Sequence, residues 1–387
     1  MEYSITPENR RKSIYLLSGL LILVVIMAYF LINFLYTGNS IRTEKETIEL
    51  GAIIPLTGTS ADAGEFITRG LSLALDDLKD SDFNYRLIYE DSQYDPKIAV
   101  DALNKLIGVD NIKFVTDYAS SITLALAPIA EKNKILLIDP ASQADTITHA
   151  GDYIFRTQTN TMQEAEFFSK FITKKIGNSR IALLAVNTDY GQSVIEDYSK
   201  KIKEFGGQVG LIQKFDAKTT DFRTFLTKAS EDKSNYILIA GNAKHSAPII
   251  VQTKELGLDF GFFATSTSVE RAEFLSMAGE AGEGIIYAYP YDSSSKDKAQ
   301  QYYSKKYNQK YNSTNEMISA NAYDVLMLIN FCAEKTKSTD QTKIKNCLYT
   351  VKDYDGASGV ISFDKNGDVE KPMIIKTVRN GKFVKVQ

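Results

Sequence analysis

Apolar and polar positions follow one another in a repeating order that predicts strands alternating with helices. Apolar runs of strand length lie at 48–54 and 85–89, and each is followed by a stretch with apolar positions at helical spacing. In the first such stretch Ile67, Leu71 and Leu78 share one helical face. Strands that alternate with helices are typical of an α/β fold with parallel sheets.

The strand and helix series begins a second time near Arg180. The first series continues through 113–116 and 134–139, and the second runs through 180–186, 236–241, 260–265 and 284–289. A chain of 387 residues is too long for one compact core. We therefore predict two lobes of similar fold, each a doubly wound parallel sheet, with a cleft between them.

After residue 290 the pattern changes to two long helices, over about 295–310 and 316–336. The end of the chain predicts β-hairpins, because Asn366-Gly367 and Asn380-Gly381 each lie between apolar runs.

The N-terminal pattern predicts a membrane anchor. Residues 14–36 carry no charge, and a membrane-spanning helix needs about 20 apolar residues. Arg10, Arg11 and Lys12 precede this stretch, which predicts a cytoplasmic segment 1–13, an anchor at 14–36, a linker at 37–47 and an extracytoplasmic remainder. A cleaved signal peptide is the alternative, but its apolar region is shorter and ends in small residues, so we favour a single-pass, uncleaved anchor.

Composition narrows the classes of function. The net charge of -3 and the scattered lysines and arginines argue against nucleic acid as a partner. His149 and His245 lie far apart, and no metal-ligand spacing or G-x-S-x-G motif occurs, so we expect no metal, no cofactor and no enzyme. Cys332 and Cys347 form either a disulfide or two buried thiols.

Small polar loops follow several predicted strands. In the first loop, "PLTGTSADAGE", Gly64 is followed by Glu65 where a phosphate-binding P-loop has lysine, so phosphate is excluded. The hydroxyls of Thr57 and Ser60 instead favour a small carboxylate or neutral polar ligand at the carboxyl end of the strand. Similar loops are "DYASSIT", "PASQADTIT" and "TDYGQS". Any one of them could be an ordinary helix cap, but four at equivalent strand ends favour a site.

Over residues 48–387 the chain resembles the type I periplasmic solute-binding proteins, in particular the leucine/isoleucine/valine-binding group that serves ABC importers. The resemblance rests on a set of motifs in the family's order: "GAIIPLTGTSADAGE", "EDSQYDPKIAVDALNKLI", "ASSITLALAPIAEKNKILLIDPAS", "FRTQ", "TDYGQ", "AGEAGEGI", "AYDVLML" and "ISFDKNGD". It implies lobes joined by a three-crossover hinge near 160, 290 and 359, with lobe 1 at 48–160 plus 291–358 and lobe 2 at 161–290 plus 359–387.

The resemblance also implies site residues. Ser120 corresponds to the serine that binds the ligand carboxylate, and Tyr190 to the tyrosine of the second lobe. Ala141 and Gln143 lie in a segment that contacts the ligand. The complete expected ligand-binding set is Thr57, Ser60, Ser120, Ala141, Gln143, Tyr190, Asn242 and Ser266.

The chain departs from the family's pattern at two of these places and at one further position in the first loop. Ser266 stands where the amino-acid binders have the glutamate that holds the ligand ammonium, Asn242 replaces a tyrosine, and Ala63 replaces an aromatic residue. A buried ammonium needs a carboxylate or several acceptors, so an α-amino acid ligand stays open. Asp189 or Asp62 could supply the charge.

The expected function is that of a membrane-anchored, extracytoplasmic solute-binding protein of an ABC importer. It would capture an amino acid or a related small polar solute by hinge closure and present it to permease and ATPase subunits. The alternatives are a ligand-sensing ectodomain for a membrane receptor or kinase, and a non-binding envelope scaffold.

Overall fold

The computed structural model describes residues 7–38, 45–292 and 295–386. The chain divides after Glu46 into two units, which are described separately.

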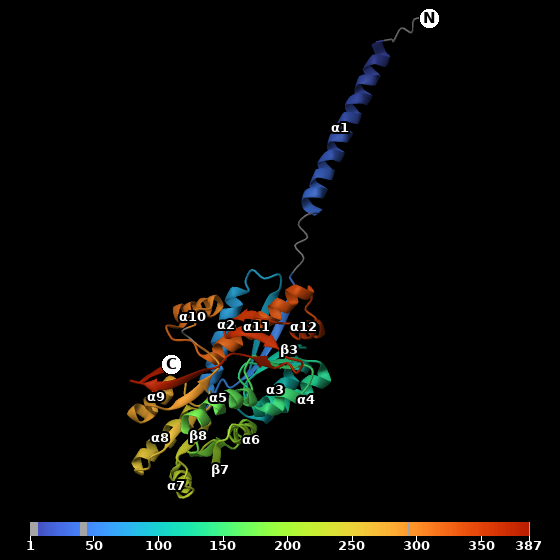
Figure 1. Ribbon diagram of the computed structural model, residues 1–387. Coiled ribbons are helices and arrows are strands. Elements are labelled where there is room, and N and C mark those ends of the chain that lie inside the picture. The colour runs from blue at the N-terminus through green and yellow to red at the C-terminus, as the bar shows by residue number, and fades with distance from the viewer. Residues whose placement is uncertain (1–6, 39–44, 293–294, 387) are drawn as a thin grey trace. The chain divides into compact units, whose positions relative to one another are not determined.

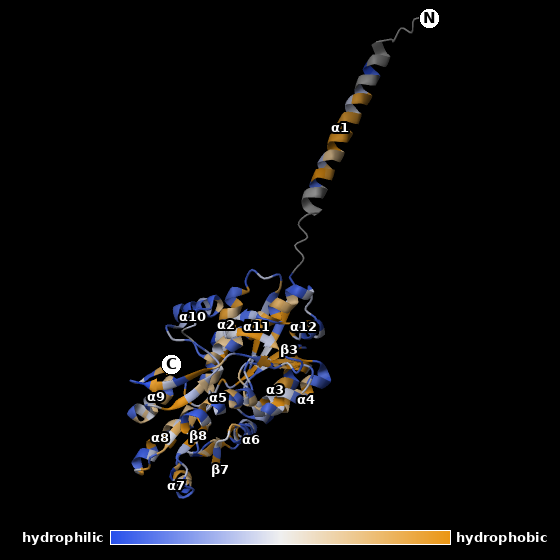
Figure 2. Ribbon diagram, viewed as in Figure 1, coloured by the Kyte–Doolittle hydropathy of each residue, from blue (hydrophilic) through white to orange (hydrophobic). Residues whose placement is uncertain are grey.

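The N-terminal unit contains one helix, α1 (Pro7–Gly38). Its stretch Tyr15–Asn33 is long and apolar enough to cross a membrane, and Figure 2 shows the hydrophobic colour along its middle turns. This property is one of length and composition, and a signal sequence shares it. Residues 1–6 of the predicted segment 1–13 and residues 39–44 of the predicted linker 37–47 lie outside the described residues.

The second unit is built on two sheets, and the first is parallel throughout. Its strand order is β2-β1-β3-β4-β5. The strands are β1 (Thr47–Ile54), β2 (Asn84–Asp91), β3 (Phe114–Asp117), β4 (Leu136–Asp139) and β5 (Ile154–Arg156). Helices α2 (Ala61–Asp77) and α11 (Met317–Thr336) pack side by side on one face, and α3 (Pro96–Gly108) and α4 (Ser120–Asn133) cover the other (Figure 1). We call this sheet with its helices the first lobe. It also holds η1 (Asp145–His149), α10 (Lys298–Tyr311) and α12 (Gln341–Leu348).

The second sheet has the order β15-β14-β10-β9-β8-β6-β7 among the described residues. Strands β6 to β10 are parallel, and the C-terminal hairpin of β14 and β15 adds antiparallel strands at one edge. The strands are β6 (Arg180–Val186), β7 (Gln208–Phe215), β8 (Tyr236–Ala240), β9 (Gly261–Ala264), β10 (Ile286–Tyr289), β14 (Ile374–Arg379) and β15 (Lys382–Lys385). We call this sheet with its helices the second lobe. The helices are α5 (Thr161–Ile176), α6 (Asp189–Glu204), α7 (Arg223–Glu231), α8 (Ala243–Glu255), α9 (Ala272–Ala278) and the short η2 (Gly279–Gly282).

Both sheets are covered on both faces, which explains the apolar runs in the sequence. Along β6, Ile181 and Leu183 pack against α5 and α6, whereas Ala182 and Leu184 face the cluster that contains α7 and α8. Parallel strands buried on two sides need apolar residues at every position. The α/β class and the doubly wound parallel sheets are therefore as predicted, and both predicted hairpins form.

The third link between the lobes differs in detail from the expected crossing near 359. Strands β11 (Tyr354–Gly356), β12 (Gly359–Phe363) and β13 (Val369–Glu370) form a small antiparallel sheet of their own. Phe363 packs on Phe155 of the first lobe, and the chain enters the second sheet only at β14. The lobe boundaries themselves stay a prediction.

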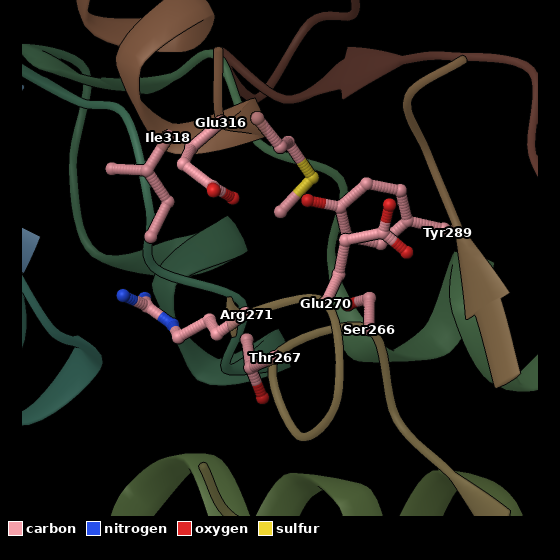
Figure 3. Close-up of a pocket in the computed structure, with 8 residues that line it drawn as sticks. Ser266, Thr267, Glu270, Arg271, Tyr289, Glu316 and Ile318 are labelled. Carbon is pink, nitrogen blue, oxygen red and sulfur yellow. The ribbon is translucent and has the colours of Figure 1, made fainter. Parts of the chain in front are cut away.

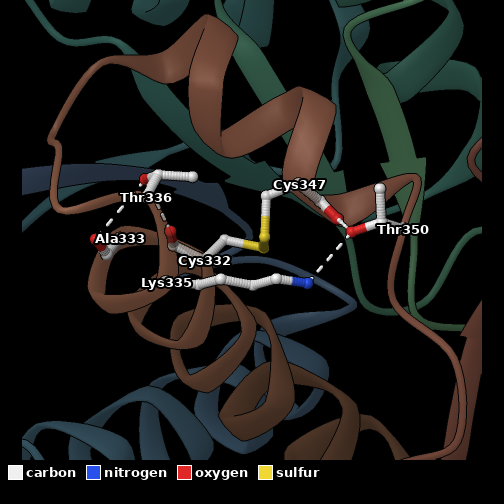
Figure 4. The surroundings of a disulfide bond; sticks show 6 residues. All are labelled: Cys332, Ala333, Lys335, Thr336, Cys347 and Thr350. Carbon is white, nitrogen blue, oxygen red and sulfur yellow. Dashed lines mark hydrogen bonds between the residues drawn. A yellow bond between two sulfur atoms is a disulfide. The ribbon is translucent and has the colours of Figure 1, made fainter.

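The two cysteines form a disulfide, which decides between the two alternatives that the sequence left open. Cys332 on α11 is bonded to Cys347 on α12, and both side chains are buried (Figure 4). The bond ties the last turns of these helices together across 15 residues of sequence.

Candidate functional site

The loops at the carboxyl ends of the strands of the two lobes meet each other. Lys244 Nζ at the start of α8 donates to the carbonyl oxygen of Thr59 at 2.7 Å. Arg271 before α9 forms an ion pair of 2.5 Å with Asp62 on α2. The backbone N–H of Asp145 donates to Ser193 Oγ at 3.2 Å. The site therefore lies where both lobes contribute side chains, and the lobes are closed on each other.

Ser120 begins α4 at the end of β3 and is buried. Its Oγ accepts hydrogen bonds from the backbone N–H groups of Gln143, at 3.3 Å, and Ala144, at 3.1 Å. Its own hydroxyl hydrogen has no acceptor among the described residues, so it is available to a ligand oxygen. Ala119 places Ser120 there with a φ of 90°, a conformation that non-glycine residues rarely adopt.

Asp139 at the end of β4 shapes the loop that holds Ala141 and Gln143. Its carboxylate accepts the backbone N–H groups of Ala141 and Ser142, each at 2.5 Å. Asp117 lies beside it, and burial together with the charge of Asp139 raises the pKa of Asp117 well above its usual value. Asp117 therefore keeps its proton, and the two hydrogen bonds to Asp139 fix the loop.

Gln143 crosses from the first lobe to the second. Its Nε2 donates to Glu164 Oε2 and reaches Ser266 Oγ, both at 3.1 Å. Ser266 donates to Glu164 through its Oγ, at 2.6 Å, and through its backbone N–H, at 3.1 Å. Tyr198 donates to the same carboxylate at 2.9 Å. The predicted site residues Gln143 and Ser266 thus both bind Glu164. Glu164 itself was not among the predicted site residues.

Tyr190 lies beside this cluster at the start of α6. Its hydroxyl donates to Thr265 Oγ1 at 2.8 Å and contacts Thr267 Oγ1 at 2.9 Å. Thr265 and Thr267 flank Ser266, so Tyr190 supports the loop in which Ser266 lies. Burial raises the pKa of Tyr190, which keeps its hydroxyl protonated.

Three predicted residues do not join this cluster. Thr57 is exposed and donates from Oγ1 to Asp91 at 2.6 Å. Ser60 is buried at the N-cap of α2. Asn242 caps α8 and accepts the backbone N–H of Lys244 at 3.0 Å. Helix capping, the ordinary alternative for such residues, describes Asn242 fully.

A small cavity lies between the lobes next to Ser266. Its lining comes from the β9–α9 loop, β10 and the start of α11, and Figure 3 shows Glu316 pointing into the space beside Arg271 and Tyr289. The lining residues are Ser266, Thr267, Glu270, Arg271, Tyr289, Glu316, Met317 and Ile318. The cavity volume of about 20 Å³ is room for one water molecule, so an amino acid does not fit in this cavity.

The charges around this cavity are largely paired. Glu270 forms an ion pair with Lys376 and accepts the hydroxyl of Tyr287. Burial raises the pKa of Glu316 to about 7, although the nearby Arg271 acts in the opposite direction. Within the described ranges, no three histidine, cysteine, aspartate or glutamate side chains are grouped in a way that could hold a metal ion.

Some of the site residues that the sequence analysis did not predict have a recognisable sequence signal, and others have none. Glu270 and Arg271 lie a few residues beyond a predicted strand end, so a wider window after β9 could have found them. Glu164 lies in the first turns of α5, after the first crossing between lobes, and no strand-end loop points to it. Glu316 caps a helix that the sequence did predict, but its direction depends on tertiary packing.

Two parallel-sheet lobes whose strand-end loops close on each other define a two-lobed solute-binding protein. The family model described as periplasmic binding protein matches residues 47–382. The chain therefore belongs to the periplasmic binding protein family, and its similarities support the leucine/isoleucine/valine-binding type I group that the resemblance indicated.

The relatives are binding proteins rather than enzymes. A leucine-, isoleucine-, valine-, threonine- and alanine-binding protein of Pseudomonas aeruginosa is 27% identical over 334 residues, which cover 84% of this chain and 88% of that protein. The structure of a leucine-binding protein from Thermotoga maritima has a TM-score of 0.83 at 25% identity and covers 88% of this chain and 98% of its own. A branched-chain amino acid transporter substrate-binding protein from Streptococcus pneumoniae, in complex with isoleucine, has a TM-score of 0.79 at 23% identity, covering 88% and 100%.

Proposed function

We propose that this protein is a membrane-anchored, extracytoplasmic solute-binding protein that captures an amino acid between its lobes for an ABC importer. The observation that carries the proposal is the hydroxyl of Ser120. It is buried at the start of α4, and its hydrogen has no acceptor among the described residues. A carboxylate oxygen is the acceptor that suits such a donor at a helix N-terminus.

Further observations support parts of this proposal. The Pseudomonas aeruginosa relative carries five amino acids in its name, which supports an amino acid as the solute. The disulfide between Cys332 and Cys347 supports a location outside the reducing cytoplasm. The apolar stretch Tyr15–Asn33 supports an anchor.

Capture requires the lobes to open, because the cavity of about 20 Å³ cannot admit an amino acid. The ligand would enter the open form and be enclosed on closure. Permease and ATPase subunits would then recognise the closed, loaded form.

The test is calorimetric titration of the purified full-length chain in detergent with leucine, isoleucine, valine, threonine and alanine. We expect the wild type to bind at least one of them. Ser120→Ala should weaken that binding about 10-fold or more, because a hydrogen bond to a charged group is lost. Ser121→Ala, at the next position of the same helix, is the matched control and should bind as the wild type does. Equal affinity of the Ser120→Ala variant would contradict the assigned role of Ser120.

One observation favours a second candidate, the non-binding envelope scaffold. In the closed form, Gln143, Ser266 and Glu164 are hydrogen-bonded to one another. A scaffold would need no more than this closed arrangement. The same titration separates the two candidates, since a scaffold would bind none of the five amino acids, whereas the importer subunit would bind at least one.

A further inference from the structure

Glu164 is a buried carboxylate without a cation. It is 1% exposed and accepts hydrogen bonds from Ser266, Tyr198 and Gln143, all of them neutral donors. No lysine or arginine in the described part of the chain forms an ion pair with it. A buried charge is costly unless a partner of opposite sign neutralises it, and burial raises the pKa of Glu164 accordingly.

The other carboxylates at the meeting of the lobes are in a different situation. Asp62 is paired with Arg271, and Glu270 is paired with Lys376. Glu316 lies in the field of the same two cations. A cationic group of a ligand would lie next to a lysine or arginine at each of these three carboxylates, and the like charges would repel each other. At Glu164 it would not.

The amide of Gln143 fills the place next to this carboxylate. Its NH₂ group lies 3.1 Å from Glu164 Oε2 and 3.1 Å from Ser266 Oγ. The carboxylate can only accept, so it fixes the amide with its nitrogen towards Glu164. A nitrogen with several hydrogens, placed between a carboxylate and a hydroxyl, has the hydrogen-bonding pattern of a bound primary ammonium group.

We propose that Glu164 and Ser266 form the binding site for the primary ammonium group of the ligand, at the place that the Gln143 amide occupies in the closed form described here. This inference rests on the proposed function, because it names the chemical group that the same cleft selects. Gln143 comes from the first lobe, whereas Glu164 and Ser266 belong to the second, so opening withdraws the amide. An ammonium group then supplies the positive charge that the amide lacks.

The arrangement also accounts for serine at position 266. A carboxylate there would lie beside Glu164, and two adjacent carboxylates repel each other in a buried site. A serine hydroxyl instead donates to Glu164 at 2.6 Å and keeps a lone pair for a further donor. The negative charge of the site thus comes from α5 rather than from the loop after β9.

The experiment compares each of the five amino acids with its deaminated acid, for example leucine with 4-methylpentanoate, by calorimetric titration of the full-length chain. We expect the wild type to prefer the amino acid at least 10-fold. Glu164→Gln keeps the side-chain shape, removes the charge, and should reduce this preference about 10- to 100-fold. Glu166→Gln on the same helix is the matched control, since Glu166 is 54% exposed and pairs with Lys201 at the surface, and it should keep the full preference.

A second variant tests the occupancy by Gln143. Gln143→Ala removes the competing amide, so we expect it to bind the amino acid several-fold more tightly than the wild type, with a similar unfolding temperature. A Glu164→Gln variant that keeps the wild-type preference, or a wild type that binds the deaminated acids equally well, would overturn the ammonium site and leave the solute-binding function standing. A wild type that binds none of these compounds would overturn the proposed function itself, and the ammonium site with it.

Discussion

Glu316 caps the N-terminus of α11 and points into the small cavity between the lobes (Figure 3). Its ordinary pKa of 4.5 is raised to about 7 by burial, and the charges of Glu270 and Asp62 act in the same direction. Arg271 and Lys376 oppose this shift without cancelling it. At neutral pH this single carboxyl group therefore lies near the midpoint of its titration.

We predict a pH-dependent stability that depends on Glu316. The folded state binds the proton more tightly than the unfolded chain, so its contribution is full below pH 4.5 and is lost as the pH rises through about 7. Between these two pH values the free energy of unfolding of the wild type should fall by ~3 kcal/mol relative to that of Glu316→Gln. In thermal unfolding this difference corresponds to a few degrees in melting temperature. Glu166→Gln, which changes an exposed carboxylate, should follow the wild type at every pH. Parallel curves for the wild type and Glu316→Gln would contradict the raised pKa.

The sequence predicted several residues of the site but not its buried carboxylates. Ser120, Gln143 and Ser266 follow predicted strands, and the carboxyl ends of parallel strands meet at one edge, so their position could be inferred. Glu164 reaches the same place from a helix after a lobe crossing, and only the packing of α5 against α6 and β10 brings it there. Whether a carboxylate forms an ion pair depends on the residues that tertiary packing places beside it, and the sequence pattern does not give these.

The junction from strand to loop to helix occurs twice with the same close approach of backbones. A Cβ on Gly64 at the start of α2 would lie 1.9 Å from the carbonyl oxygen of Pro55, and a Cβ on Gly191 at the start of α6 would lie 1.8 Å from that of Val186. Both helices therefore pack directly on the end of the strand before them. This closeness positions Tyr190, the residue before Gly191.

We predict that Gly191→Ala destabilises the protein and disturbs the site. The methyl group has no space against a backbone carbonyl, so α6 must move away from β6, at a cost of about 1–3 kcal/mol. The melting temperature should fall by a few degrees. Gly108→Ala at the end of α3 is the matched control, because outside its own turn of helix no atom lies within 4 Å of the added Cβ. An unchanged melting temperature for Gly191→Ala would show that the junction is looser than this structure has it.

The accuracy of the predicted helices and strands depends on how regular the apolar pattern of each element is. The predicted bounds of the mostly apolar strands β1, β6 and β8 agree with the structure to within a residue or two, because burial on both faces requires a continuous apolar run. The edge strand β7 was missed, since its half-exposed pattern breaks the run, and the three-residue strands β5 and β11 are too short to show a pattern. Because strands β11 to β13 form a small sheet of their own, the chain joins the second sheet at Ile374 and not near the expected residue 359.

On the scale of the whole second unit, several contacts between the lobes stabilise the closed form. The ion pair of Arg271 and Asp62, the bond from Lys244 to Thr59 and the Gln143 cluster all cross the cleft. Arg271 also lies over the ring of Phe66, 5.2 Å from its centroid. The sequence leaves Asp62 open as a partner for a ligand ammonium, but in the structure Asp62 forms an ion pair with Arg271. Opening must break these contacts, so each of them lowers the population of the open form that admits a ligand.

We therefore predict that Asp62→Asn shifts the unliganded protein towards the open form. The side chains of Arg271 and Asp62 are 15% and 40% exposed, and an ion pair of this kind contributes about 1 kcal/mol, or roughly a 5-fold change in the ratio of open to closed protein. Small-angle X-ray scattering of the full-length chain in detergent should give a larger radius of gyration for Asp62→Asn than for the wild type. Asp82→Asn, which breaks the exposed pair with Lys337 within the first lobe, should leave it unchanged. If Asp62→Asn scattered like the wild type, the closed state would depend on the Gln143 cluster instead, and Gln143→Ala would then have to produce the larger radius.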